Sequence, residues 1–236
     1  DKLIWETKSK LREKMIEFIK QRSTDTHILR NENPKYIAEV FSKINPKALT
    51  IGFARRFATY KRAHLLFRDL ARLSRIVNNP DKPVQFLFAG KAHPADKAGQ
   101  DLIKYIIDIS KRPEFIGKIL FIHNYDMNIG KMLVQGCDVW MNTPTRPLEA
   151  SGTSGEKGVM NGTLHFSVLD GWWVEGYKQD AGWALPLEQS FDIQELQDEL
   201  DAEAIYSILE NEIVPAYYYR NDKNIPVLWV DFIKNT

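Results

Sequence analysis

The chain has 236 residues, of which 44% are hydrophobic and 27% charged, and its formal net charge at pH 7 is +1. This length and composition predict one large globular domain with a substantial core. The near-neutral charge argues against nucleic acid or an anionic membrane as a partner, and no stretch reaches the ~20 apolar residues needed to span a bilayer.

Helix-like and strand-like runs follow one another along the chain. Apolar residues at helical spacing predict a first helix from 3 to about 22, and Asn33 before Pro34 predicts the start of a second. Strands are expected at 48–54, 84–89, 119–122, 139–141 and 164–169, and helices at 64–77, 96–110, 127–135, about 192–196, 201–213 and 226–233. This alternation predicts an α/β fold with a doubly wound, Rossmann-like parallel sheet in a single domain over 1–236, with leading helices at 1–46 and the α/β core at 47–236.

The cysteine and histidine content points away from metal and disulfide chemistry. Cys137 is the single cysteine and lies in an apolar run, which predicts a buried reduced thiol and a cytoplasmic setting. No two histidines stand at metal-ligand spacing, so no metal site is expected, and we interpret His165 as a core residue with satisfied hydrogen bonds. The chain begins at Asp1 without an initiator methionine or a signal-peptide pattern, and we interpret it as a fragment of a longer polypeptide.

The run from Glu149 to Lys157, with the sequence EASGTSGEK, combines a carboxylate, small residues and a lysine. Small residues expose backbone N–H groups, so such a segment can form a concave loop around an anion. A desolvated lysine amine can also react with an aldehyde such as that of pyridoxal phosphate. The alternative interpretation is a flexible turn without a ligand.

A second cluster follows the strand expected at 48–54. Four cations occur within eight residues, namely Arg55, Arg56, Lys61 and Arg62. Cations at the carboxyl end of a parallel strand lie at the edge where open α/β sheets bind their ligands. The alternative is a solvated basic turn, which would leave the presence of the 149–157 run unexplained.

With both clusters in view, the chain resembles the α-glucan (glycogen, starch and maltodextrin) phosphorylases, most closely their shorter bacterial and archaeal branch. The resemblance extends from about Trp5 to the end. It is densest in GKA at 90–92, in GCDVWMNTP at 136–144 and from Arg146 to Glu175. It implies the carboxyl-terminal lobe of a B-type glycosyltransferase fold, with the active site in a cleft against an amino-terminal lobe that this chain does not contain.

The resemblance also implies site residues and a reaction. Lys157 matches the residue that carries pyridoxal 5′-phosphate, and Tyr125 a position facing that cofactor. Cofactor-phosphate contacts match Arg55, Gly152, Thr153 and Ser154, reacting-phosphate contacts match Arg56 and Lys61, and glucose contacts match Glu149 and Ser151. The implied reaction is retaining phosphorolysis of an α-glucan or maltooligosaccharide by inorganic phosphate, which yields glucose 1-phosphate. The fragment alone is expected to be inactive, and the sequence is compatible with a homo-oligomer of the full-length protein.

Some residues depart from the family pattern. Glu156 and Gly158 flank the lysine where many relatives place methionine and an apolar residue, and Asp126 replaces a cation found in the animal enzymes. Two rival functions remain open: a nucleotide-sugar-dependent glucan synthase of the same fold, and a non-catalytic glucan-binding module. Synthases of that kind carry a second glutamate where this chain has Lys157, and the retention of the cations argues against a non-catalytic module.

Overall fold

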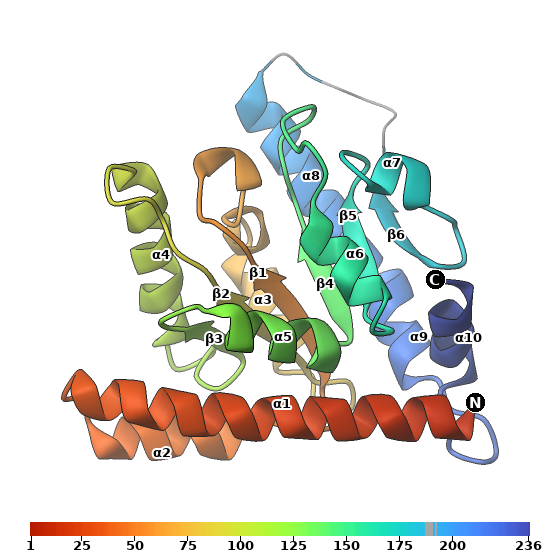
Figure 1. The fold of residues 1–236 in the computed structure, drawn as a ribbon, viewed down its shortest axis with the longest axis horizontal. Helices are drawn as coiled ribbons and strands as arrows, with labels where there is room; N and C mark the ends of the chain where they lie inside the picture. The colour runs from red at the N-terminus through yellow and green to blue at the C-terminus, as the bar shows by residue number, and fades with distance from the viewer. Residues whose placement is uncertain (187–190, 192) are drawn as a thin grey trace.

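Six parallel strands form one sheet in the computed structural model, which describes residues 1–186, 191 and 193–236, apart from the side chains at 27–29. The strands are β1 (Leu49–Ala54), β2 (Val84–Ala89), β3 (Ile119–Ile122), β4 (Val139–Asn142), β5 (Leu164–Val168) and β6 (Gly182–Leu185). Their spatial order is β3-β2-β1-β4-β5-β6 (Figure 1). The expected doubly wound sheet is therefore confirmed, and its strand order switches direction between β1 and β4.

Helices cover both faces of the sheet, which explains why its central strands are apolar on both sides. One face packs against α1 (Lys2–Leu29), α2 (Pro34–Lys43), α5 (Met127–Gly136) and α6 (Thr153–Val159). The other packs against α3 (Leu70–Val77), α4 (Lys97–Ser110), α8 (Gln194–Ile208), α9 (Val214–Tyr218) and α10 (Val227–Asn235). Three short helical turns are η1 (Thr59–Lys61), η2 (Leu65–Phe67) and α7 (Trp173–Gly176), and the π-helical η3 (Leu209–Ile213) lies between α8 and α9.

The helix predictions were confirmed in position but differ in their bounds. Asn33 caps α2 as expected, because its side chain accepts a hydrogen bond from the backbone N–H of Lys35. The helix expected at 64–77 is divided into η2 and α3, since Asp69 caps α3 and starts it afresh. The two helices expected near 192–196 and 201–213 form one continuous helix, α8 followed by the π-helical η3; Asp192 itself lies outside the described residues. Strand β6 and helix α9 were not predicted.

Helix α1 lies across the amino-terminal end of the sheet, and the strand arrows point away from it (Figure 1). Its Arg12 donates to Asp138 Oδ1 at 2.6 Å, and the backbone N–H of Thr50 donates to the other carboxylate oxygen at 2.9 Å. Lys8 Nζ donates to the Thr163 hydroxyl and to the Cys137 carbonyl, both at 3.0 Å. One helix therefore joins the segments that precede β1, β4 and β5.

Cys137 is buried and free, as expected, and burial raises the pKa of its thiol well above the ordinary value. Within the described part of the chain, none of the helices has the length and apolar character to cross a bilayer.

Replacing Arg12 with Met should lower the free energy of unfolding of this chain by about 3–5 kcal/mol, because Asp138 would keep a buried charge without its cation. The matched control is Lys2→Met on the same helix, where the Lys2–Glu6 pair is exposed, and there we expect a change under about 0.5 kcal/mol. Urea denaturation at pH 7 measures both. Equal losses in the two variants would contradict the anchoring role of Arg12.

Candidate functional site

A buried carboxylate binds two cations at the carboxyl end of β1 and β4. Glu149 Oε2 accepts hydrogen bonds from Arg55 Nη2 at 2.8 Å and from Lys61 Nζ at 2.6 Å, and each of these side chains is 8% exposed. Arg55 directly follows β1, Lys61 ends η1, and Glu149 lies in the β4–α6 loop. The Glu149 backbone N–H donates to Asp170 Oδ2 at 2.9 Å, beyond the end of β5. Three strand ends thus supply one charged cluster.

This cluster joins two cations to two carboxylates, and Arg55 keeps donors that none of the described residues use. Burial lowers the pKa of the Arg55 guanidinium, while Glu149 opposes that shift, and Arg55 stays a cation at neutral pH. Its Nε and Nη1 atoms are buried and have no hydrogen-bond partner among the described residues. Unpartnered buried donors are costly, on the order of 1–3 kcal/mol each, so their presence at a sheet edge indicates a place for an acceptor.

The 152–155 segment lies beside Glu149, because a Cβ built at Gly152 would stand 3.6 Å from the Glu149 Cγ. Gly152 has φ of +82°, a conformation that favours glycine, and helix α6 begins at the next residue. A side chain at Gly155 would place its Cβ 2.5 Å from the His165 ring and 2.8 Å from Trp172 Nε1. The run expected to be a loop is therefore the start of a helix, and its small residues allow α6 to lie directly on β5.

His165 differs from the expectation of a satisfied core histidine. It is fully buried, yet neither ring nitrogen makes a hydrogen bond of normal geometry to a described residue. Burial, with a further contribution from the Arg55 charge, lowers its pKa to about 3, so the ring is neutral at pH 7. Its ring centroid lies 5.2 Å from Trp172 and 4.7 Å from Trp173, whose ring packs in the core. Asn142 Oδ1 and Trp172 Nε1 are also buried without described partners.

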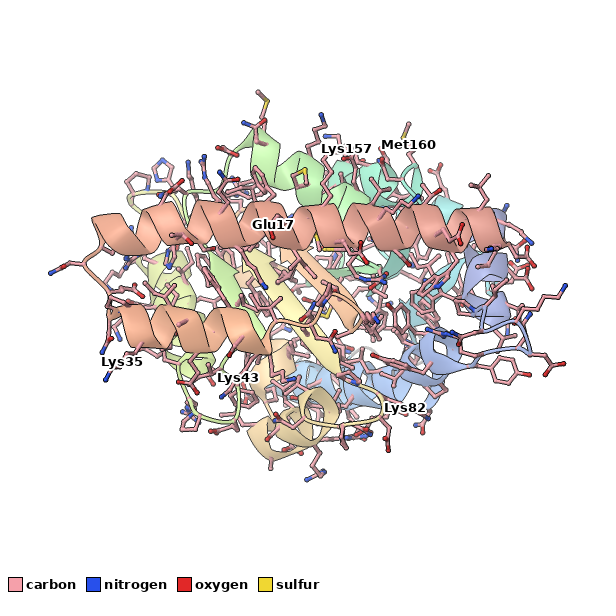
Figure 2. The ribbon with its side chains drawn as sticks, turned by 90° about the horizontal axis from the view of Figure 1, so that it is seen from below. Glu17, Lys35, Lys43, Lys82, Lys157 and Met160 are labelled. Atoms are coloured by element: carbon pink, nitrogen blue, oxygen red, sulfur yellow. The ribbon has the colours of Figure 1, made fainter. Side chains whose placement is uncertain are left out.

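Lys157 lies in a separate surface pocket of about 410 Å³ between α5 and α6. The amine-bearing side chain is exposed, and Figure 2 shows Lys157 beside Met160 at the outer margin of the molecule. Residues lining the pocket include Tyr125, Gly130, Lys131, Trp140, Ser154 and Asn161. The Ser154 hydroxyl accepts from Trp140 Nε1 at 3.2 Å, and burial raises the pKa of Tyr125.

The residues expected at the site therefore form two groups. Arg55, Lys61 and Glu149 are joined by hydrogen bonds, whereas Tyr125, Ser154 and Lys157 share the α5–α6 pocket. Among the described contacts, no hydrogen bond or ion pair connects the two groups. Arg56 and Thr153 are exposed, Gly152 forms the turn before α6, and the Ser151 hydroxyl lies 3.4 Å from Glu156 Oε1.

Sequence reasoning missed Asn142 and Asp170 as parts of the site. Both directly follow apolar runs that the sequence predicts as strands, at 139–141 and 164–169. Polar residues at the carboxyl ends of parallel strands lie at the ligand-binding edge, and this rule, applied to every expected strand, would have found them.

Comparison with known proteins finds one matching family model and several similar curated proteins. A family model described as carbohydrate phosphorylase matches residues 8–184. The chain is 44% identical over 234 residues to the glycogen phosphorylase of Aquifex aeolicus, covering 99% of this chain and 33% of that protein. It is 48% identical over 219 residues to the maltodextrin phosphorylase of Thermococcus litoralis, covering 92% and 26% respectively. It is 38% identical over 233 residues to the glycogen phosphorylase of Mycobacterium tuberculosis, covering 99% and 27%. The chain thus spans about a quarter to a third of these curated relatives.

Replacing Glu149 with Gln should lower the free energy of unfolding by about 3 kcal/mol, because Arg55 and Lys61 would lose their shared counter-ion. Adding Lys61→Met should cost less in this variant than in the unchanged chain, giving a coupling free energy above about 1 kcal/mol in a double-mutant cycle. Urea denaturation provides all four values. The exposed Glu175→Gln serves as the control, and additive effects of the two site changes would show that the contact is not formed in solution.

Proposed function

This chain belongs to the carbohydrate phosphorylase family, and on that premise we propose that its full-length protein is an α-1,4-glucan phosphorylase. It would use inorganic phosphate to cleave an α-glucan or maltooligosaccharide and release glucose 1-phosphate with retention at the anomeric carbon. The observation that carries the proposal is the buried Arg55 side chain, which keeps two unpartnered nitrogens beside Glu149 and Lys61. An anionic ligand is the natural partner for such donors.

The residues present fit pyridoxal 5′-phosphate. Its phosphate requires cations and donors, which Arg55 offers together with the turn at Gly152, Thr153 and Ser154. Its aldehyde requires an accessible amine, which Lys157 presents in a pocket whose volume of about 410 Å³ lies within the usual range for small-molecule sites. Tyr125 borders the same pocket and suits contact with the pyridine ring.

The reacting phosphate and the sugar would use the remaining residues. Arg56 is exposed beside the cluster and offers a planar fork for two phosphate oxygens, while Lys61 supplies a compact charge. The described hydrogen bonds to the Glu149 carboxylate both use Oε2, so Oε1 can accept from a glucose hydroxyl. Ser151, two residues further along the loop, contributes a second hydroxyl-binding position.

The chemistry depends on holding two phosphate groups close together. When bound, pyridoxal phosphate supplies a phosphate that can give and accept a proton beside the reacting phosphate. Unit charges in contact repel by roughly 4 kcal/mol at an effective dielectric constant of 20, so this arrangement needs neighbouring cations. Arg55, Arg56 and Lys61 offset that repulsion. The bound phosphate in turn stabilises the positive charge that develops on the glucose ring.

We assign this activity to the full-length protein. Phosphorolysis requires that water be excluded and the sugar oriented, and a cleft closed between two lobes provides both. One lobe presents an open surface at Lys157. The isolated 236-residue chain is therefore proposed to lack phosphorolysis.

Lys157 is proposed as the cofactor attachment site, and Lys131 is its matched control because both are exposed lysines in one pocket. Borohydride reduction of the full-length holoenzyme, followed by peptide mass mapping, should place the pyridoxyl group on Lys157. Lys157→Ala should abolish the hydroxylamine-sensitive absorbance of the cofactor, whereas Lys131→Ala should retain it. A pyridoxyl label on any other lysine would overturn the assignment.

Glucose 1-phosphate release from maltooligosaccharides and phosphate tests the proposed function directly. In the full-length enzyme, Arg56→Ala and Lys61→Ala should each reduce kcat/KM for phosphate by about 10²–10³, as on loss of a preorganised donor to transition-state charge. Lys97→Ala, in an exposed pair on α4, is the control. Arg56 is exposed, so its variant should fold normally. Glucose transfer from a nucleotide sugar without phosphorolysis would contradict the proposal.

A further inference from the structure

Lys61 and Glu149 lie on two different loops, and hydrogen bonds join these two loops directly. The backbone N–H of Thr145 donates to the Tyr60 carbonyl at 2.7 Å. The Thr143 hydroxyl donates to the carbonyls of Lys61 at 3.0 Å and Arg62 at 3.3 Å. The segment that follows β4 is therefore connected directly to η1, which carries Lys61.

Arg62 reinforces this connection from the other side. Its Nε donates to the Thr143 carbonyl at 3.0 Å, and its Nη2 donates to the Pro144 carbonyl at 2.9 Å. The residue is 3% exposed and has φ of +49°, a conformation that non-glycine residues rarely adopt. Such a backbone persists where the surrounding contacts fix it.

Helix α8 holds the remaining guanidinium nitrogen. Arg62 Nη1 lies 3.0 Å from Asp198 Oδ1 and 2.7 Å from Asp201 Oδ2. Each carboxylate also accepts from a glutamine on the same helix, at 2.7 and 2.8 Å. Burial opposes ionisation of Asp198, but hydrogen bonds, led by that from His64, lower its pKa to about 2. Both partners of Arg62 are thus fixed on a long helix.

Neither the Arg62 side chain nor its two aspartates contacts the charged atoms of Lys61 or Glu149 in the described structure. Arg62 nevertheless donates hydrogen bonds to the loop that carries Glu149, and it directly follows Lys61 in the sequence. A planar guanidinium can donate to two carbonyls and one carboxylate and pair with a second carboxylate at once, whereas the ammonium of lysine cannot reproduce that geometry. Arg62, Thr143, Asp198 and Asp201, called the clamp below, therefore connect the two loops to each other and to α8.

We propose that this clamp makes Arg62 a positioning residue, which fixes the distance between Lys61 and Glu149 and so the affinity of the site for the reacting phosphate. The inference rests on the proposed phosphorolysis. Lys61 Nζ donates to Glu149 Oε2 at 2.6 Å. If the loops separated, the ammonium and the carboxylate would no longer converge on one anion and one sugar, and misplacement by about 1 Å can cost 10²-fold in rate.

Arg72 provides a matched control. Like Arg62 it binds two carboxylates of the α8–η3 helix, with Nη1 2.7 Å from Glu203 and Nη2 2.7 Å from Glu210. It makes no described hydrogen bond to η1 or to the β4–α6 loop. Arg72→Lys therefore reports the loss of ion pairs to this helix without disturbance of the site.

The kinetic test uses the full-length holoenzyme. Arg62→Lys should raise the KM for phosphate about tenfold or more with unchanged cofactor content, whereas Arg72→Lys should leave that KM within about twofold. Thr143→Val removes the hydroxyl bonds but keeps the α8 ion pairs, and it should raise the KM for phosphate about threefold. If Arg62→Lys does not fold, the KM of Thr143→Val for phosphate tests the positioning role instead.

An activity-independent readout is the coupling free energy between Lys61 and Glu149, measured by double-mutant cycles in the 236-residue chain. It should fall to less than about half in the Arg62→Lys background and be retained in the Arg72→Lys background. Similar losses of thermal stability in both variants, with unchanged coupling and unchanged KM, would overturn the proposal. If the full-length wild type shows no phosphorolysis, the proposed function fails, and the coupling measurement still decides the positioning role.

Discussion

The junction between β1 and β4 is the constraint on which the rest of this structure depends. Here the two halves of the sheet meet through a short register, Ile51 opposite Val139 and Gly52 opposite Trp140. A buried carboxylate closes each end of the junction: Asp138 binds Arg12 at the amino-terminal end, and Glu149 binds two cations at the carboxyl end. Ion pairs between side chains therefore supplement the short backbone pairing of β1 and β4 at both of its ends.

Ion pairs to Glu149 offset part of the cost of burying two cations at one site. Glu149 neutralises part of the charge on Arg55 and Lys61, while Nε and Nη1 of Arg55 have no partner among the described residues. Breaking a buried pair costs about 3–5 kcal/mol, so the carboxylate also restrains the loops that bear these residues. Lys157 differs from these residues, since it lies exposed on α6.

Long apolar runs made most of the sheet predictable from the sequence, because strands buried on both faces, such as β1 and β2, carry a continuous hydrophobic signal. Strand β6 has four residues beginning with glycine, too few to show a period. The small residues of the 149–157 run predicted a loop, whereas packing of α6 on β5 offsets the low helix propensity of Gly155 and Gly158. The sequence predicted two helices here because the stretch between them is polar. They form one helix, since tertiary partners such as Arg62 stabilise the buried acids Asp198 and Asp201.

Local patterns and motif order were enough to predict the α/β class, the resemblance to the phosphorylases and the identity of the charged residues. Only the tertiary structure decided which of them meet. Glu149 stands 94 residues from Arg55 in the chain and yet bonds to it, since strand order brings β4 beside β1. The unsatisfied state of His165 was likewise invisible in the sequence, because hydrogen-bond partners are set by neighbouring elements rather than by neighbours along the chain.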